Sequence, residues 1–397
     1  MRVEGRDRAL AGVLALLGAA VYVAFGAGVL TVYDYHGRLA EALLQGRWWL
    51  TEAPPWLNEL LACGEGRWCV VYPPLPALLA VPLVPFFGTA LSQLLVAQIL
   101  GGASAGVLFL ALRAFGAPRL VALGGAVLSA LGTTLLFSSA DGRAWYAAHS
   151  VAMFFTSGAL LVAARGGPPW LVGVAIGLAA LARLPVAAAF PALALLAARR
   201  SGTPYPAALR DVVLGGLPFA LAYAGYSLLR WGTPLDVGYL RLTEGDVFFR
   251  HGLFSPLYLP RHLNAIFLEA PDFVDGVPWA FRPRFIGMSL LLTTPAFLWV
   301  LGGLRDVRRV GIAAVALAAG LVLVPNILHG TVGFQQFGYR FSLDLQPFLV
   351  TLAVAGDAYR QGAWRSRPSV LFLIACVLAV VVNVYATIAI VRFGWWQ

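Results

Sequence analysis

The chain is dominated by apolar runs of roughly 20 residues, separated by shorter polar and charged stretches. A helix of about 20 apolar residues crosses the roughly 30 Å hydrocarbon core of a bilayer. We therefore predict an all-α polytopic membrane protein with about 11 transmembrane helices. The predicted spans are 9–31, 90–112, 120–137, 149–164, a tight pair of short helices within 170–198, then 212–229, 287–304, 310–328, 341–354 and 369–390.

Residues 75–88 are apolar enough to suggest another span, but the stretch is short and interrupted by prolines. Counting it as a crossing would place Arg113 and Arg119 outside the cell, against the preference of basic residues for the cytoplasm. We therefore interpret residues 75–88 as a re-entrant or interfacial helix and 90–112 as the second span.

Composition supports a membrane protein. Hydrophobic residues make up 60% and charged residues 12% of the sequence, and the mean hydropathy is +0.80. Soluble domains carry about 25% charged residues. The net charge of +10 could suggest nucleic-acid binding, but the basic residues, all arginines, lie between the apolar runs rather than in one domain. This distribution is typical of membrane topology and argues against a nucleic-acid partner.

The distribution of arginines also predicts the topology. The basic residues 1–8 should stay in the cytoplasm, and the first span is too long for a signal-peptide core, so we interpret it as a retained anchor. The polar segments 32–89 and 230–284 and the loops 138–146 and 329–340 would then face outward. We expect a multi-pass plasma-membrane protein, with a first module at 1–230 and a second membrane region at 231–397 that begins with the external segment 231–284.

Cys63 and Cys69 lie in the first predicted external segment, six residues apart. A disulfide between them is consistent with an oxidising compartment. The spacing is a poor zinc signature, and no histidine lies close by. Cys376 falls within a predicted span and is expected to serve packing alone.

Two acids at the outer ends of spans are candidates for chemistry. Asp34 follows the first span, and Asp141 follows the third, so the predicted topology places both on the same side. A carboxylate at the membrane surface could act as a general base, because partial desolvation raises its pKa. Each could instead cap the helix that follows it, so both interpretations stay open.

Three arginines are candidate anion ligands. Arg183 lies at the predicted turn between two apolar helices, Arg340 at the outer start of a span, and Arg143 beside Asp141. A guanidinium at a membrane boundary suits a lipid-linked phosphate, because its planar fork donates two hydrogen bonds at once. The alternative is that these side chains extend to lipid head groups.

The order of these features resembles the GT-C superfamily of membrane glycosyltransferases, which includes the protein O-mannosyltransferases and the aminoarabinose transferase of lipid A. The matching features, in chain order, are Asp34 after the first span, Tyr-Pro-Pro-Leu at 72–75 opening an apolar juxtamembrane helix, Asp141 after the third span, the glycine-containing segment 173–183 ending in Arg183, the stretch 231–239 beginning Trp-Gly-Thr-Pro, and Tyr339-Arg340-Phe341.

The resemblance implies a GT-C-type fold with external juxtamembrane helices. It also implies an inverting transfer from a polyprenyl-phosphate-linked sugar, on the extracytoplasmic face, to a glycolipid, glycan or protein. Asp34 would be the base, and Asp141 would orient the acceptor or help to hold a divalent ion, Mg or Mn. Phosphate ligands would be Arg183, Arg340 and Arg143, and the expected substrate contacts are Tyr35, His36, His149 and Tyr339.

One departure weakens the match: Tyr72 stands where some relatives have a lysine before the paired prolines. Phosphate binding should therefore depend on the arginines. Two other functions remain open, a ligase or polymerase of lipid-linked glycans and a lipid or solute transporter. The sequence lacks a phosphate-binding P-loop, a nucleophile elbow and the usual zinc-hydrolase motif.

Overall fold

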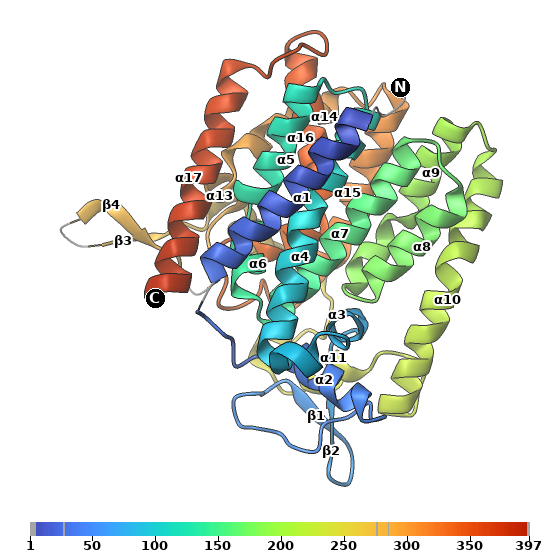
Figure 1. Ribbon diagram of the computed structural model, residues 1–397, viewed down its shortest axis with the longest axis vertical. Coiled ribbons are helices and arrows are strands. Elements are labelled where there is room, and N and C mark those ends of the chain that lie inside the picture. The colour runs from blue at the N-terminus through green and yellow to red at the C-terminus, as the bar shows by residue number, and fades with distance from the viewer. Residues whose placement is uncertain (1–4, 27, 275–276, 285, 395–397) are drawn as a thin grey trace.

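The computed structural model describes residues 5–26, 28–274, 277–284 and 286–394. Helices run along the long axis, and several short elements gather at the end opposite the start of the first helix (Figure 1). The longest helices are α1 (Gly5–Gly26), α4 (Val84–Ala114), α7 (Ala144–Ala164), α10 (Tyr205–Trp231), α15 (Val310–Leu328) and α17 (Val370–Phe393).

Shorter segments complete the bundle. They are α5 (Arg119–Leu131), α6 (Leu135–Asp141), α8 (Pro169–Ala180), η1 (Leu184–Ala189), α9 (Phe190–Ser201), α13 (Leu290–Thr293), η5 (Pro295–Trp299), α14 (Val300–Arg305), η6 (Arg340–Asp344) and α16 (Gln346–Arg360). Outside the bundle lie α2 (Tyr35–Leu44), β1 (Leu60–Gly64), β2 (Arg67–Val70), α3 (Leu75–Ala80), α11 (Gly238–Leu242), η2 (Val247–Phe249), η3 (Pro256–Tyr258), α12 (Leu259–Leu263), η4 (Asn264–Leu268), β3 (Asp272–Val274) and β4 (Val277–Arg282).

Within the described residues, seven helices are long and apolar enough to cross a membrane, or eight if the bent pair α5–α6 forms one span. A multi-pass helical membrane protein is therefore confirmed, but the prediction of about 11 spans is not. Predicted span 341–354 becomes the 3-10 turn η6 followed by α16, and span 287–304 is divided among α13, η5 and α14. Pro295 starts a new turn after the non-helical Thr294, which interrupts the latter run.

The structure agrees with the interpretation of residues 75–88. They form the six-residue helix α3 and the start of α4, rather than a span of their own. Within α4, Gly88 has φ 70° and ψ 179°, a conformation that favours glycine and that breaks the helix direction there. The predicted turn near Arg183 is also present, between α8 and η1.

Helices α1 and α4 cross closely because small residues face one another. A side chain added at Gly102 would collide with the backbone of Ala19, and one added at Gly106 would collide with the Ala11 carbonyl. This small-xxx-small arrangement is the usual basis of close helix packing in membranes.

Asp7, at the start of α1, links this helix to the end of α4 and the start of α5. Its carboxylate, almost fully buried, accepts hydrogen bonds from Arg119 Nε at 2.7 Å and Arg113 Nε at 3.2 Å. The N-terminal segment and the turn at 113–119 therefore lie at one end of the molecule, as the interpretation of residues 75–88 requires.

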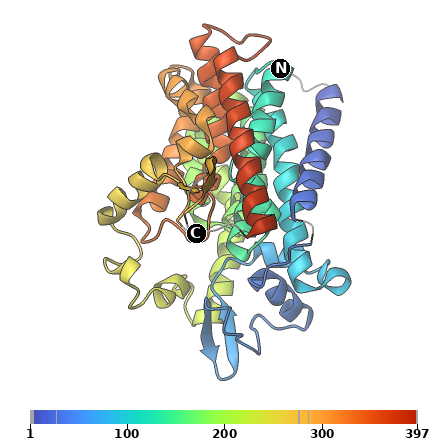
Figure 2. The same cartoon turned by 90° about the vertical axis from the view of Figure 1, so that its left-hand side faces the viewer.

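The class is mostly helical rather than purely α, because two short antiparallel hairpins, β1–β2 and β3–β4, are present. The predicted disulfide joins Cys63 and Cys69 across the first hairpin, with the two Cα atoms 5.8 Å apart. Turned by 90°, the molecule shows this hairpin beside a group of short helices from 232–270, again at the end away from the start of α1 (Figure 2).

Candidate active site

A cavity of about 710 Å³ lies where these short elements meet the bundle. Its wall combines segments that are distant in the sequence: the loop before β1, the start of α7, the turn after α8, the α11 segment and the chain around η6. The polar lining side chains that matter here are Glu59, Tyr72, Arg183, Tyr239, His329 and Arg340. The sequence predicted two of these, Arg183 and Arg340, as phosphate ligands.

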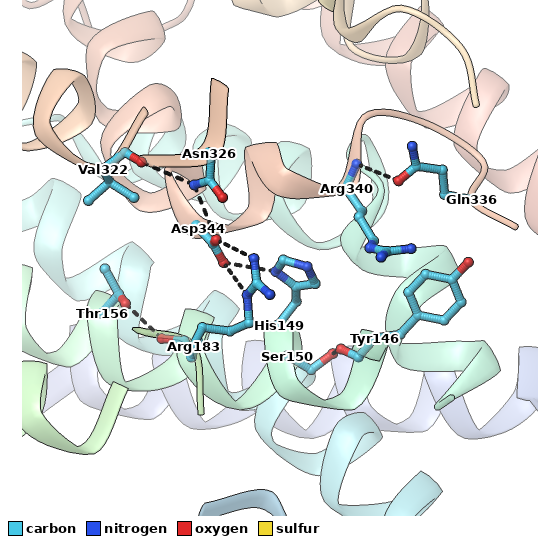
Figure 3. Close-up of polar contacts among 11 residues, drawn as sticks. Tyr146, His149, Ser150, Thr156, Arg183, Val322, Asn326, Gln336, Arg340 and Asp344 are labelled. Atoms are coloured by element: carbon cyan, nitrogen blue, oxygen red, sulfur yellow. Dashed lines mark hydrogen bonds and ion pairs between the residues drawn. The ribbon is translucent and has the colours of Figure 1, made fainter. Parts of the chain in front are cut away.

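Arg183 is placed by the break between α8 and η1, where its backbone is extended (φ −147°, ψ 101°). Its guanidinium pairs with Asp344, with Nη2 2.8 Å from Oδ2 and Nε 3.2 Å from Oδ1. Asp344 is fully buried and also lies 2.8 Å from His149 Nδ1 and 3.3 Å from Asn326 Nδ2 (Figure 3). Asp344 therefore fixes the guanidinium of Arg183 through its Nε and Nη2 atoms, and the Arg183 side chain is 19% exposed.

Arg340 has a different environment, because no described carboxylate forms an ion pair with it. Its Nη1 donates to the Phe334 carbonyl at 2.9 Å, while its Nε is buried and finds no acceptor within the described ranges. The rings of Trp145, Tyr146 and Phe341 surround the guanidinium at 5.4 to 5.9 Å.

The two arginines converge on the cavity. Both guanidinium carbons lie 5.4 Å from the centre of the Phe341 ring. Asp344 offsets the charge of Arg183, whereas that of Arg340 has no acid partner among the described residues. Arg340 therefore offers the cavity a guanidinium without an ion pair among the described residues and a donor without an acceptor there, and both features suit an anionic ligand.

Arg143 is not among the lining residues. Its Nε lies 3.2 Å from Asp141 Oδ1, and its Nη1 donates to Gln335 Oε1 at 2.7 Å. Its predicted role as a phosphate ligand gains no support from the cavity and stays a prediction.

The loops that carry Asp34 and Asp141 do meet. Gln93 joins them, because its amide donates to the carbonyls of Tyr33 and Gly142 and accepts from the backbone of His36. Each carboxylate, however, has its own partners and neither lines the cavity. Asp34 is 3% exposed and accepts from Arg38 Nε at 2.7 Å and Thr89 Oγ1 at 2.5 Å.

The four predicted substrate contacts are buried behind the cavity wall rather than in it. His149 supports Asp344, and Tyr339 OH lies 2.8 Å from His262 Nδ1. Tyr35 OH accepts from the backbone of Glu59 at 3.1 Å, and His36 Nε2 lies 3.1 Å from the Ala144 carbonyl. Burial lowers the pKa of His36 to about 4, so the neutral imidazole donates that bond.

Among the lining residues that the sequence did not single out are Glu59, Tyr239 and His329. Glu59 Oε2 is buried and has no hydrogen-bond partner among the residues that the structure describes. Burial raises the pKa of Glu59 to about 7, although the positive charge of Arg340 opposes this shift. No sequence signal distinguishes Glu59, since it stands among other charges of a long polar segment. Asp344 could have been found, because it and Arg183 are isolated opposite charges in apolar stretches.

A divalent metal ion does not fit the predicted acids. Among the residues that the structure describes, no three His, Cys, Asp or Glu side chains gather closely enough to hold a metal ion. Arg38 occupies Asp34 and Arg143 occupies Asp141, so neither carboxylate presents a free donor set.

Comparison with known proteins gives a match in fold. No protein-family model and no curated protein matches this sequence. The crystal structure of ArnT from Cupriavidus metallidurans bound to undecaprenyl phosphate is similar, with a TM-score of 0.52 over 88% of this chain and 14% sequence identity. The match covers 59% of that ArnT chain. This chain therefore shares its fold with that ArnT structure, in agreement with the fold that the resemblance implied.

Proposed function

We propose that this protein transfers a sugar from a polyprenyl-phosphate-linked donor to an acceptor hydroxyl. The observation that carries the proposal is the arginine pair, Arg183 and Arg340, in a cavity of about 710 Å³. The shared fold adds support, because the similar ArnT structure holds undecaprenyl phosphate. This chain matches only part of ArnT, so the sugar and the acceptor are not carried over from it.

The two arginines have distinct tasks in this proposal. Arg340 meets the donor phosphate with its unpaired Nε and its unneutralised charge. Arg183, oriented by Asp344, offers the phosphate its remaining N–H groups. As the bond between the anomeric carbon and the phosphate oxygen breaks, negative charge grows on the phosphate, and the arginines stabilise it. Attack from the opposite side inverts the anomeric centre.

The transfer also needs a base that takes the acceptor's proton. The resemblance implies Asp34 for this step, with Asp141 orienting the acceptor. Asp34 would have to give up its bonds to Arg38 and Thr89 before it could meet an acceptor. The cavity itself holds a different carboxylate, Glu59.

We place this chemistry on the extracytoplasmic face of the plasma membrane. The end that carries Asp7 also carries its partners Arg113 and Arg119, and Arg200 lies over the ring of the neighbouring Phe115, as expected of a cytoplasmic face. The cavity lies toward the other end, where the Cys63–Cys69 disulfide suits an oxidising compartment.

The test is transfer of label from undecaprenyl-phosphate-linked mannose, arabinose and glucose in membranes that contain the expressed chain. We expect R340A to lower transfer about 100-fold, as loss of a group that stabilises leaving-group charge does. The matched control is R210A, because Arg210 is a 69%-exposed arginine of α10 paired with Asp211, away from the cavity. Equal transfer by wild type and R340A would contradict the role of Arg340.

Two other outcomes would replace the proposed function. Movement of an intact lipid-linked oligosaccharide onto an acceptor, without use of single-sugar donors, would show a ligase or polymerase. Passage of the donor lipid across the bilayer without product would show a transporter.

A further inference from the structure

We infer that Glu59 is the carboxylate that takes the proton of the acceptor hydroxyl. This assignment rests on the proposed sugar transfer and names the group that performs its proton step. Glu59 lines the same cavity as Arg183 and Arg340, and its Oε2 is buried without a hydrogen-bond partner. A buried polar atom without a partner is costly, so such an atom on a residue that lines a cavity is suited to a hydrogen bond from a bound water or ligand.

The backbone around Glu59 is firmly held. Its N–H donates to Tyr35 OH at 3.1 Å, and strand β1 begins at the next residue. The Cys63–Cys69 disulfide closes the hairpin that follows. A reacting group must be fixed to within a fraction of an ångström, and these contacts supply that support.

The other nearby carboxylates are already in use. Asp236 accepts from Tyr223 OH at 2.6 Å and from the Gly238 N–H at 3.2 Å, and Asp246 caps η2 by accepting from Phe248 N at 2.8 Å. Asp34 and Asp141 do not line the cavity and are each paired with an arginine. Among the described acids that line the cavity, Glu59 alone has a buried carboxylate oxygen without a partner.

The charges that face Glu59 suit a base that works near neutral pH. Arg340 supplies a positive charge, and the phenols of Tyr35 and Tyr239 face it from α2 and α11. Burial raises the pKa of Glu59 to about 7, the range in which a general base is most effective. The two phenols stay neutral there, because burial raises the pKa of each above its usual value.

The step balances without a further reactant. The acceptor oxygen forms a bond to the anomeric carbon of the donor sugar, and its proton moves to a carboxylate oxygen of Glu59. The bond from that carbon to the phosphate oxygen breaks, and the electron pair leaves with the polyprenyl phosphate toward Arg183 and Arg340.

The experiment compares E59Q, E65Q and D34N with the wild type in the membrane transfer assay, from pH 5 to 9. Glu65 is an exposed residue at the tip of the same hairpin, so E65Q is the matched control. Binding of radiolabelled undecaprenyl phosphate to the purified full chain is measured independently of transfer. It shows whether each variant is folded and still binds the donor lipid. E59D tests whether a shorter carboxylate restores part of the rate.

We expect E59Q to lower the transfer rate about 100-fold or more and to abolish the rise of the rate with pH around pH 7. It should bind undecaprenyl phosphate as the wild type does, with E59D partly active. Wild-type rates and pH dependence in E59Q would overturn the assignment, as would loss of the pH dependence in D34N alone. Absence of transfer by the wild type from every donor would overturn the proposed function itself, and the role of Glu59 with it.

Discussion

At the scale of the residue, Asp344 decides how the site is charged. A guanidinium at an apolar boundary loses part of its hydration, and an ion-pair partner offsets that free-energy cost. Asp344 does this for Arg183 while it also binds His149 and Asn326 (Figure 3). Arg340 forms no ion pair with any acid in the described part of the chain, which leaves its guanidinium available to a ligand. For anion binding, this difference in ion pairing between Arg183 and Arg340 matters more than the presence of two arginines.

Removing Asp344 should therefore damage stability as well as activity. We expect D344A to lower the free energy of unfolding by about 3–5 kcal/mol, because it leaves Arg183 buried without its partner. The double variant R183A/D344A should lose clearly less than the sum of the two single variants, since it removes both charges. Thermal or denaturant unfolding of the purified protein in detergent measures all three. Additive losses would show that the pair contributes no coupling energy.

At the scale of the element, the β1–β2 hairpin supports the cavity wall. It starts one residue after Glu59, and the disulfide between Cys63 and Cys69 limits its movement. Neither residue lines the cavity, so the disulfide affects chemistry only through the position of Glu59.

Replacing both cysteines, C63S/C69S, should lower the transfer rate several-fold and the unfolding free energy by about 2 kcal/mol, as expected for a short disulfide loop. Donor-lipid binding should change little, because Arg183 and Arg340 lie on other elements. The control is C376A, which removes the half-buried free cysteine of α17. An unchanged transfer rate in C63S/C69S would show that the hairpin does not position Glu59.

The elements also show how far the sequence could lead. Hydropathy identified the long helices α1, α7, α15 and α17, because length and apolarity are local properties. It did not foresee the break at Pro295 or the 3-10 turn η6, because mean hydropathy over a window does not register a change in backbone conformation within an apolar run.

In the candidate site, too, some features could be predicted from the sequence and others could not. Arg183 and Arg340 were predicted because a charge in an apolar stretch is costly wherever it falls. Their surroundings were not predicted, because the Arg183–Asp344 pair joins residues 161 positions apart. Glu59 becomes distinctive only in the folded chain, where its Oε2 is shielded from water and its side chain lines a cavity.

At the scale of the whole molecule, the two ends differ in a way that implies orientation. One end carries the start of α1 with its buried Asp7 and several arginines, and the other gathers the short helices and the disulfide (Figures 1 and 2). Arginine-rich ends remain in the cytoplasm, and disulfides persist outside it. Both arguments favour the proposed location of the cavity on the outer side.

Labelling of introduced cysteines tests this orientation. In a C376A background, E244C should react with a membrane-impermeant thiol reagent in intact cells, because exposed Glu244 follows α11 near the cavity. R308C, exposed before α15 at the arginine-rich end, should react only after the membrane is permeabilised. Cys63 and Cys69 are oxidised and do not react. The reverse pattern would place the cavity in the cytoplasm, where a donor sugar on an outward-facing polyprenyl phosphate could not reach Arg340.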